Sequence, residues 1–126
     1  MKKESAYWDF LMKKGRSLLE MNQGSNEIAL ETDDALQALD LLKGNQIAVL
    51  GGDILSEKEN GKLVYAYQLW GDGQEYHYLN WYCDKKDSEN QEEYVERSYI
   101  IAKDSIKAAN DIAKRLGKKC YIVIVI

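Results

Sequence analysis

The chain has 126 residues, 45% of them hydrophobic and 30% charged, with a formal net charge of −4. This length predicts a single domain, residues 1–126, and the composition is typical of a globular protein with one core, not of a disordered chain. The acidic charge argues against a nucleic-acid partner, and no apolar run is long enough to predict a membrane span. Because the N-terminus lacks the apolar centre of a secretory signal, we expect a cytoplasmic protein.

The first third of the chain predicts two helices. Apolar residues recur at helical spacing over residues 5–21 and predict the first helix. Residues 27–30 predict a short extended segment. The second helix is expected to begin with Thr32 or Asp33 as its N-cap and to end at Gly44.

Three strands are expected next, over residues 46–55, 62–70 and 75–83. Asn60-Gly61 and Asp72-Gly73 between them predict two-residue turns. Two tight turns make the third strand parallel to the first and place Glu59 opposite Lys62. Ile54 then faces Tyr67.

The end of the chain predicts a long helix followed by a buried strand. Ser88 with Gln91 matches a capping box for a helix over residues 88–116, and Gly117 is suited to its C-terminal cap. The apolar run 121–126 predicts a strand covered on both faces. A crossover through the long helix returns this strand parallel to the first and third strands. The predicted fold class is α+β, with a mixed four-stranded sheet of order 3-2-1-4, in which residues 27–30 cover the outer edge of the last strand.

This register also divides the strand residues between two faces. We assign Gly52, Ile54, Tyr65 and Tyr67 to the face under the long helix. The other face is expected to be more open, and a one-residue slip in either hairpin would exchange the two. This open face carries Gly51, Asp53, Gln68, Trp70, His77 and Trp81.

The residues that could carry catalytic chemistry are better explained by structural roles. His77 is the single histidine, and the predicted register leaves Asp53 two strands away from it, about 10 Å. Neither a nucleophilic triad nor a metal-ligand spacing is present, and Gly51-Gly52-Asp53 lacks the remainder of a phosphate-binding loop. The two glycines more often admit a large neighbour, here Trp70. We therefore predict no catalytic residue, metal or cofactor.

The two cysteines, Cys83 and Cys120, are far apart in the sequence and form no C-x-x-C pair. We expect them to be reduced thiols that pack as small apolar residues.

Seven aromatic residues lie between Tyr65 and Tyr82. Many of them are needed for the core, so a binding role is expected only for those on the open face and its rim, namely Trp70, Trp81 and Tyr82 with their acidic neighbours. Exposed aromatic rings are typical of protein interfaces. Acidic residues among the rings argue against an RNA platform and favour a basic protein partner.

Three segments carry a resemblance to a known family: Ile47-Ala-Val-Leu-Gly-Gly-Asp53, Asn80-Trp-Tyr-Cys83 and Glu93-Tyr-Val-Glu-Arg-Ser98. Over residues 35–105 the chain resembles immunity protein 40, a family of bacterial polymorphic toxin systems. The resemblance implies a protein without enzymatic activity that binds and neutralises a cognate toxin by stoichiometric occlusion. The residues we expect to contact the partner are Asp53, Trp70, Asp72, His77, Trp81 and Asp84.

Two alternatives remain open at this point. One is a small-molecule-binding or enzymatic domain that uses Asp53 and His77. The other is a homodimer formed through an exposed edge or the open sheet face.

Overall fold

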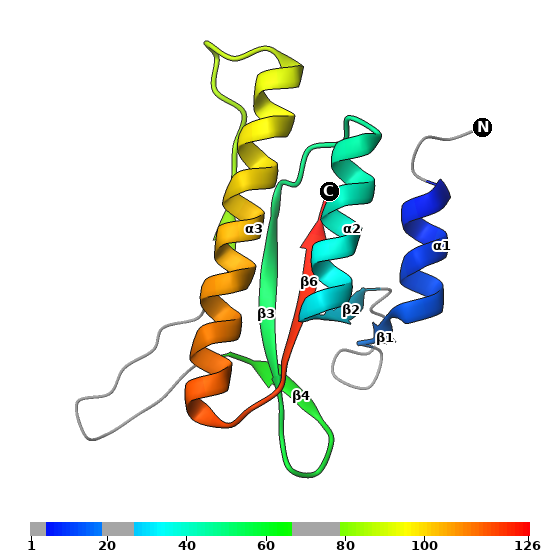
Figure 1. The fold of residues 1–126 in the computed structure, drawn as a ribbon, viewed down its shortest axis with the longest axis vertical. Coiled ribbons are helices and arrows are strands. Elements are labelled where there is room, and N and C mark those ends of the chain that lie inside the picture. The colour runs from blue at the N-terminus through cyan, green and yellow to red at the C-terminus, as the bar shows by residue number, and fades with distance from the viewer. Residues whose placement is uncertain (1–4, 19–26, 67–78) are drawn as a thin grey trace.

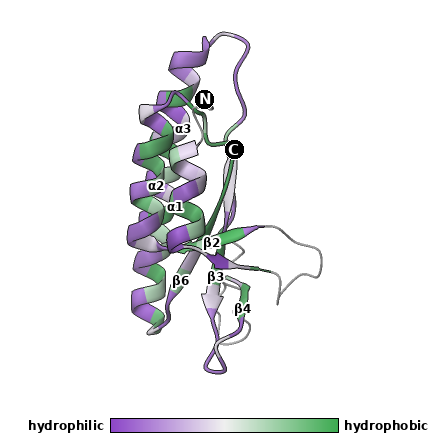
Figure 2. Cartoon of the chain, turned by 90° about the vertical axis from the view of Figure 1, so that its right-hand side faces the viewer, coloured by the Kyte–Doolittle hydropathy of each residue, from purple (hydrophilic) through white to green (hydrophobic). Residues whose placement is uncertain are grey.

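The computed structural model describes residues 5–18, 27–66 and 79–126, and within them three helices lie side by side against one face of a curled sheet (Figure 1). Figure 2 shows the helices on one side and the strands on the other. The helices are α1 (Ser5–Lys14), α2 (Thr32–Gly44) and α3 (Gln91–Leu116). The α+β class, with two N-terminal helices and a long helix before the last strand, is confirmed.

The sheet is larger and more uniform in strand direction than predicted. In the described ranges it has six strands in the order β1-β2-β6-β3-β4, with β5 also paired to β3, and every described pairing is antiparallel. A four-stranded mixed sheet was therefore wrong, although the position of residues 27–30 beside the last strand is confirmed. The strands are β1 (Arg16–Ser17), β2 (Ile28–Glu31), β3 (Gly51–Glu57), β4 (Leu63–Tyr65), β5 (Trp81–Tyr82) and β6 (Cys120–Val125).

The first helix is shorter than predicted because the chain turns at Gly15. The Gly15 N–H donates to Leu11 O at 2.7 Å, and a Cβ at Gly15 would stand 2.5 Å from that oxygen and collide with the side chain of Ile28. The end of α1 therefore packs closely on β2. The prediction extended this helix to residue 21.

The second helix ends at Gly44, as predicted, but its N-cap is Glu31. After it, Gln46 adopts a left-handed φ of 59°, and the Ile47 N–H bonds to Leu42 O at 2.9 Å. Because residues 45–47 close the helix, β3 begins at Gly51, later than the predicted residue 46.

The long helix is capped at Asn90, two residues after the predicted N-cap Ser88. Asn90 is the N-cap: its side chain accepts from Glu93 N at 2.8 Å, and Glu93 Oε1 accepts from Asn90 N at 2.9 Å. This is the reciprocal capping box that we predicted for Ser88 and Gln91. At the other end Gly117 has φ 66°, which confirms it as the C-cap.

The β3–β4 hairpin has a three-residue loop, where two residues were predicted. Lys58 N donates to Lys62 O, Gly61 N donates to Lys58 O, and Gly61 has φ 85°. A turn followed by a left-handed glycine is the usual three-residue hairpin loop. Leu55 therefore pairs with Tyr65, which shifts the predicted register by one residue.

The fifth strand lies directly beside β3, not outside β4. At this edge of β3 the Ala66 N–H bonds to Ile54 O, and Leu79 N donates to Ala66 O. From there β5 runs in the same direction as β4, with Gly52 opposite Trp81. Since β6 is also antiparallel to β3, the crossover through α3 joins two parallel strands, as predicted. Their predicted parallel alignment with β3 is wrong.

The main core fills the space between the helices and the sheet. Buried residues of all three helices pack there against Ile54, Trp81 and Ile122. A second cluster, which includes Leu55, Tyr121 and Val123, lies on the other face of the sheet. Both cysteines are buried free thiols, which confirms their prediction. No helix in the described ranges has the length and apolarity needed to cross a membrane.

Candidate functional site

The two residues of β5 point to opposite faces of the sheet. Trp81, opposite Gly52, packs in the core under the helices and is 7% exposed. A Cβ on Gly52 would lie 2.6 Å from Trp81 Cζ3 and 2.7 Å from Val123 O, and a Cβ on Gly51 would collide with the backbone of Trp81. The glycine pair therefore admits a large neighbour, as predicted, but the neighbour identified is Trp81.

The predicted exposure of Trp81 is consequently wrong. Its assignment to the open face assumed that a full strand separates it from β3, whereas β5 pairs with β3 itself. Trp81 Nε1 finds no acceptor among the described residues. In this position the indole packs in the core, and its predicted contact with a partner stays a prediction.

On the face of the sheet away from the helices, the helix-free face, Tyr82, Gly51 and Val125 form a row across three strands. Tyr82 and Val125 flank Gly51 on either side and are 77% and 39% exposed. Asp53 follows Gly51 by two residues in β3 and so lies on the same face. Tyr65, opposite Leu55, also belongs to this face and is 44% exposed. The exposure of Tyr82 is confirmed, while the assignment of Tyr65 to the core is wrong because of the one-residue shift.

A hollow of about 320 Å³ opens beside Asp53, lined by Asp53, Ile54, Tyr65, Ala66 and Asn80. The Asp53 side chain is half-buried, and burial raises the pKa of its carboxyl group. Asn80 Nδ2 donates to Tyr82 Oη at 3.0 Å, so the amide joins the hollow to the exposed tyrosine. The carboxyl group of Asp53, the amide oxygen of Asn80 and the two phenol oxygens can accept hydrogen bonds from Lys or Arg side chains.

Asp84 is exposed but lies apart from this hollow, on the loop between β5 and α3. Its carbonyl oxygen accepts from Arg97 Nη2 at 2.5 Å. Arg97 also donates to both carboxylate oxygens of Glu89, at 2.8 and 2.5 Å. These hydrogen bonds hold the pKa of Glu89 at about 2. The Arg97 clamp thus fixes the loop that follows β5 onto α3.

Three of the predicted contact residues, Trp70, Asp72 and His77, fall outside the described residues. Their partner-binding roles, and a convergence of His77 with Asp53, stay predictions. Of the remaining three residues, the helix-free hollow includes Asp53 alone. Asn80 and Tyr65 were not predicted as site residues. The face of Tyr65 depends on the three-residue β3–β4 loop, and the position of Asn80 depends on the pairing of β5 with β3.

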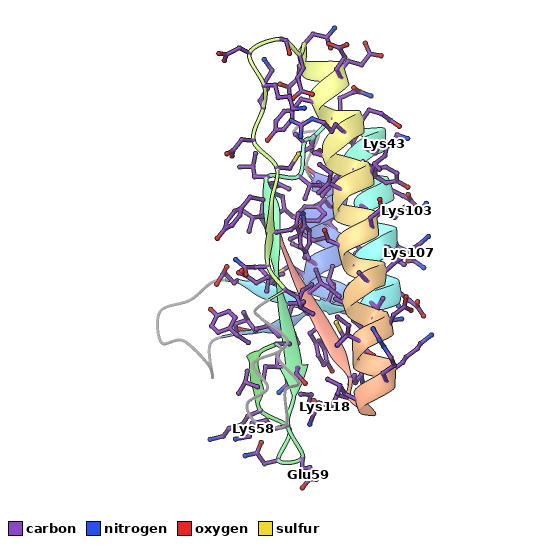
Figure 3. All side chains as sticks on the ribbon, turned by 90° about the vertical axis from the view of Figure 1, so that its left-hand side faces the viewer. Lys43, Lys58, Glu59, Lys103, Lys107 and Lys118 are labelled. Atoms are coloured by element: carbon purple, nitrogen blue, oxygen red, sulfur yellow. The ribbon has the colours of Figure 1, made fainter. Side chains whose placement is uncertain are left out.

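The outer side of the helices has a different character. Lys43, Lys103 and Lys107 extend from the helices on the side away from the sheet (Figure 3). Lys43 Nζ forms an ion pair with Glu96 at 3.1 Å, with both side chains substantially exposed. Such pairs contribute little energy and are typical of a solvated face. The helix-free face is therefore the better candidate for binding.

The described residues offer little to catalysis. Among them no group of three His, Cys, Asp or Glu side chains is placed to hold a metal ion. Burial raises the pKa of both thiols, that of Cys120 to about 11, so neither is a ready thiolate nucleophile.

The comparisons with known proteins give one match. A family model described as Immunity protein 40 matches residues 17–126. No curated protein and no solved structure matches the chain.

Proposed function

Because the chain belongs to the immunity protein 40 family, we propose that it binds a cognate bacterial toxin and neutralises it by stoichiometric occlusion. The family match over residues 17–126 is the observation that supports this function most directly. It implies a toxin protein as partner and a role that does not depend on catalysis. The binding mode proposed below rests on the helix-free face.

We assign the toxin-binding surface to Tyr82, Tyr65, Asp53 and Asn80. A half-buried carboxyl group between two exposed phenol rings suits a basic side chain of the toxin, with the rings packing against its aliphatic part. Exposed tyrosines contribute large contact areas at low conformational cost, and they often carry most of the energy of an interface. Asp84 and the clamped loop stand at the end of β5 and extend this surface.

The charge of the chain is expected to assist the encounter. With a formal net charge of −4, the protein attracts a basic toxin and raises the association rate, and added salt should reduce that rate. The rings of Tyr82 and Tyr65 would then set the dissociation rate. A toxin bound in this way loses access to its own target.

The test uses the cognate toxin domain, to be sought in the gene immediately upstream of the gene for this chain. Tyr82→Ala should weaken binding roughly 30-fold by removing a central aromatic anchor, and Asp53→Asn should weaken it several-fold while keeping the side-chain shape. Calorimetry would measure the affinities, and growth of cells that express the toxin would measure protection. Lys107→Ala, on the outer side of the helices, is the control and should change neither.

Absence of binding to the unmodified protein would overturn the proposed function. Full affinity in the Tyr82→Ala, Asp53→Asn double variant would leave the function standing but reject this surface. Thermal unfolding of each variant must match that of the parent, so that lost protection reports lost contact.

A further inference from the structure

The C-terminal half of β6 has a strand partner on only one side among the described residues. The β2–β6 pairs end at Leu30 opposite Ile122, whereas β3 continues beside β6 up to Val125. Beyond Leu30, towards the start of β2, the strand pairs instead with β1, where Ile28 faces Ser17. The strands β2 and β6 therefore diverge and leave an open edge along Ile124 and Ile126.

The ladder pattern shows which backbone groups point to this open edge. Glu57 N donates to Lys119 O, and Leu50 N donates to Val125 O. In an antiparallel ladder, every second residue directs both its N–H and its C=O group to the same neighbouring strand. The backbone groups of residues 119, 121, 123 and 125 therefore point towards β3. The N–H and C=O groups of Ile124 consequently face away from β3. So does the N–H of Ile126, because it lies opposite the Val125 C=O in the same planar peptide unit. On the opposite side, Leu18 N donates to Glu27 O, so the backbone groups of residues 27 and 29 point towards β1. Those of Ile28 point into the gap between β2 and β6.

A groove of about 410 Å³ occupies the gap, and its walls are mostly apolar. Tyr7, Trp8 and Leu11 of α1 and Ile28 of β2 form one side, and the end of β6 forms the other. Backbone groups on an apolar wall are best satisfied by the backbone of another extended chain. Because walls stand on both sides, the gap suits one extended segment better than the edge of a second sheet.

We propose that this groove accepts an extended segment of the toxin, which adds a strand beside β6. This inference rests on the proposed function and deepens it. Glu27 contributes the carboxylate of the lining, so the segment should be apolar at alternate positions and carry a Lys or Arg. Val125 lies both on the groove and in the row with Gly51 and Tyr82, so the added strand continues the helix-free surface around the sheet edge.

Hydrogen exchange in the complex with the cognate toxin domain tests the proposal. The amides of Ile124 and Ile126 should become at least tenfold slower to exchange on binding. The amides of Val123 and Val125 already address β3 and should change much less. A stable complex without this alternation would overturn the added strand and leave the proposed function intact, whereas absence of any complex would overturn both.

A pair of variants isolates the backbone contribution. Ile126→Pro removes an outward N–H, and Ile126→Ala removes most of the same side chain but keeps that N–H. We expect the proline variant to bind on the order of tenfold more weakly than the alanine variant, because an acceptor on the toxin is left unpaired. Equal affinities would overturn the proposal. So would concentration-dependent protection of both amides in the isolated protein, which would assign the edge to a second copy of the chain.

Discussion

Trp81 and Tyr82 are neighbours of similar bulk in a two-residue strand, yet they are 7% and 77% exposed. The difference arises from the alternation of side chains along a strand and from what lies opposite each one. The Trp81 ring occupies the space that a side chain at Gly52 would fill, on the side of the helices. Tyr82 instead flanks Gly51 on the helix-free face. Aromatic content alone therefore does not locate a binding surface. In this strand one ring is buried in the core under the helices, and the next is exposed to solvent.

The largest expected effect separates these two residues. Trp81→Ala should lower the free energy of unfolding by about 3–5 kcal/mol, because it removes a buried aromatic side chain and leaves a cavity. Tyr82→Ala should change that free energy by about 0.5 kcal/mol or less, since the side chain is largely solvated. Urea denaturation of both variants measures the contrast. A similar loss in the two would show that Tyr82 packs in the fold.

Substitution of Gly52, the glycine opposite Trp81, should lower the free energy of unfolding by a smaller amount, because it disturbs the same packing. Gly52→Ala places a methyl group against the Trp81 ring and the Val123 carbonyl oxygen, and should cost about 1–3 kcal/mol of unfolding free energy. Gly44→Ala is a matched control, because a Cβ at Gly44 meets nothing within 4 Å. The control should be neutral or slightly stabilising at the end of α2. If Gly52→Ala were equally neutral, the close packing of Trp81 on β3 would be wrong.

Part of the fold follows from local sequence signals that predict it correctly. Gly44 and Gly117 end their helices where expected, and the apolar run at the chain end forms the buried strand. Where two capping signals lie close together in the sequence, the predicted start of a helix can be wrong by a few residues. The Asn90 and Glu93 pair caps the long helix in place of Ser88 and Gln91.

The candidate site depended on information that local patterns do not contain. Gly61 as the third loop residue moved the register by one, which exchanged the faces of β4 and exposed Tyr65. The return of the chain to the edge of β3 placed Trp81 over Gly52, a pairing set by long-range packing. Asp53 was placed correctly, on the face away from the helices. The two turn motifs, Asn60-Gly61 and Asp72-Gly73, do not determine the direction of β5 relative to β3.

The smallest expected effect concerns the Arg97 clamp that holds the loop after β5. Hydrogen bonds from Arg97 lower the pKa of Glu89 from 4.5 to about 2, so the folded state binds this proton less readily than the unfolded state does. The stabilisation is therefore complete above about pH 4.5 and is lost as the pH falls towards 2. Glu89→Gln should lower stability at neutral pH, and its difference from the parent should shrink over that window.

Urea unfolding at several pH values measures this difference, with Asp87→Asn as the control. Asp87 is an exposed carboxylate of the same loop, outside the hydrogen bonds that Arg97 donates to Glu89 and Asp84. Its removal should give a small difference that does not follow the Glu89 window. If the clamp orients β5 for binding, Glu89→Gln should also weaken toxin affinity at neutral pH, although less than Tyr82→Ala does. A pH-independent difference would show that Glu89 is not ionised against Arg97 in the folded protein.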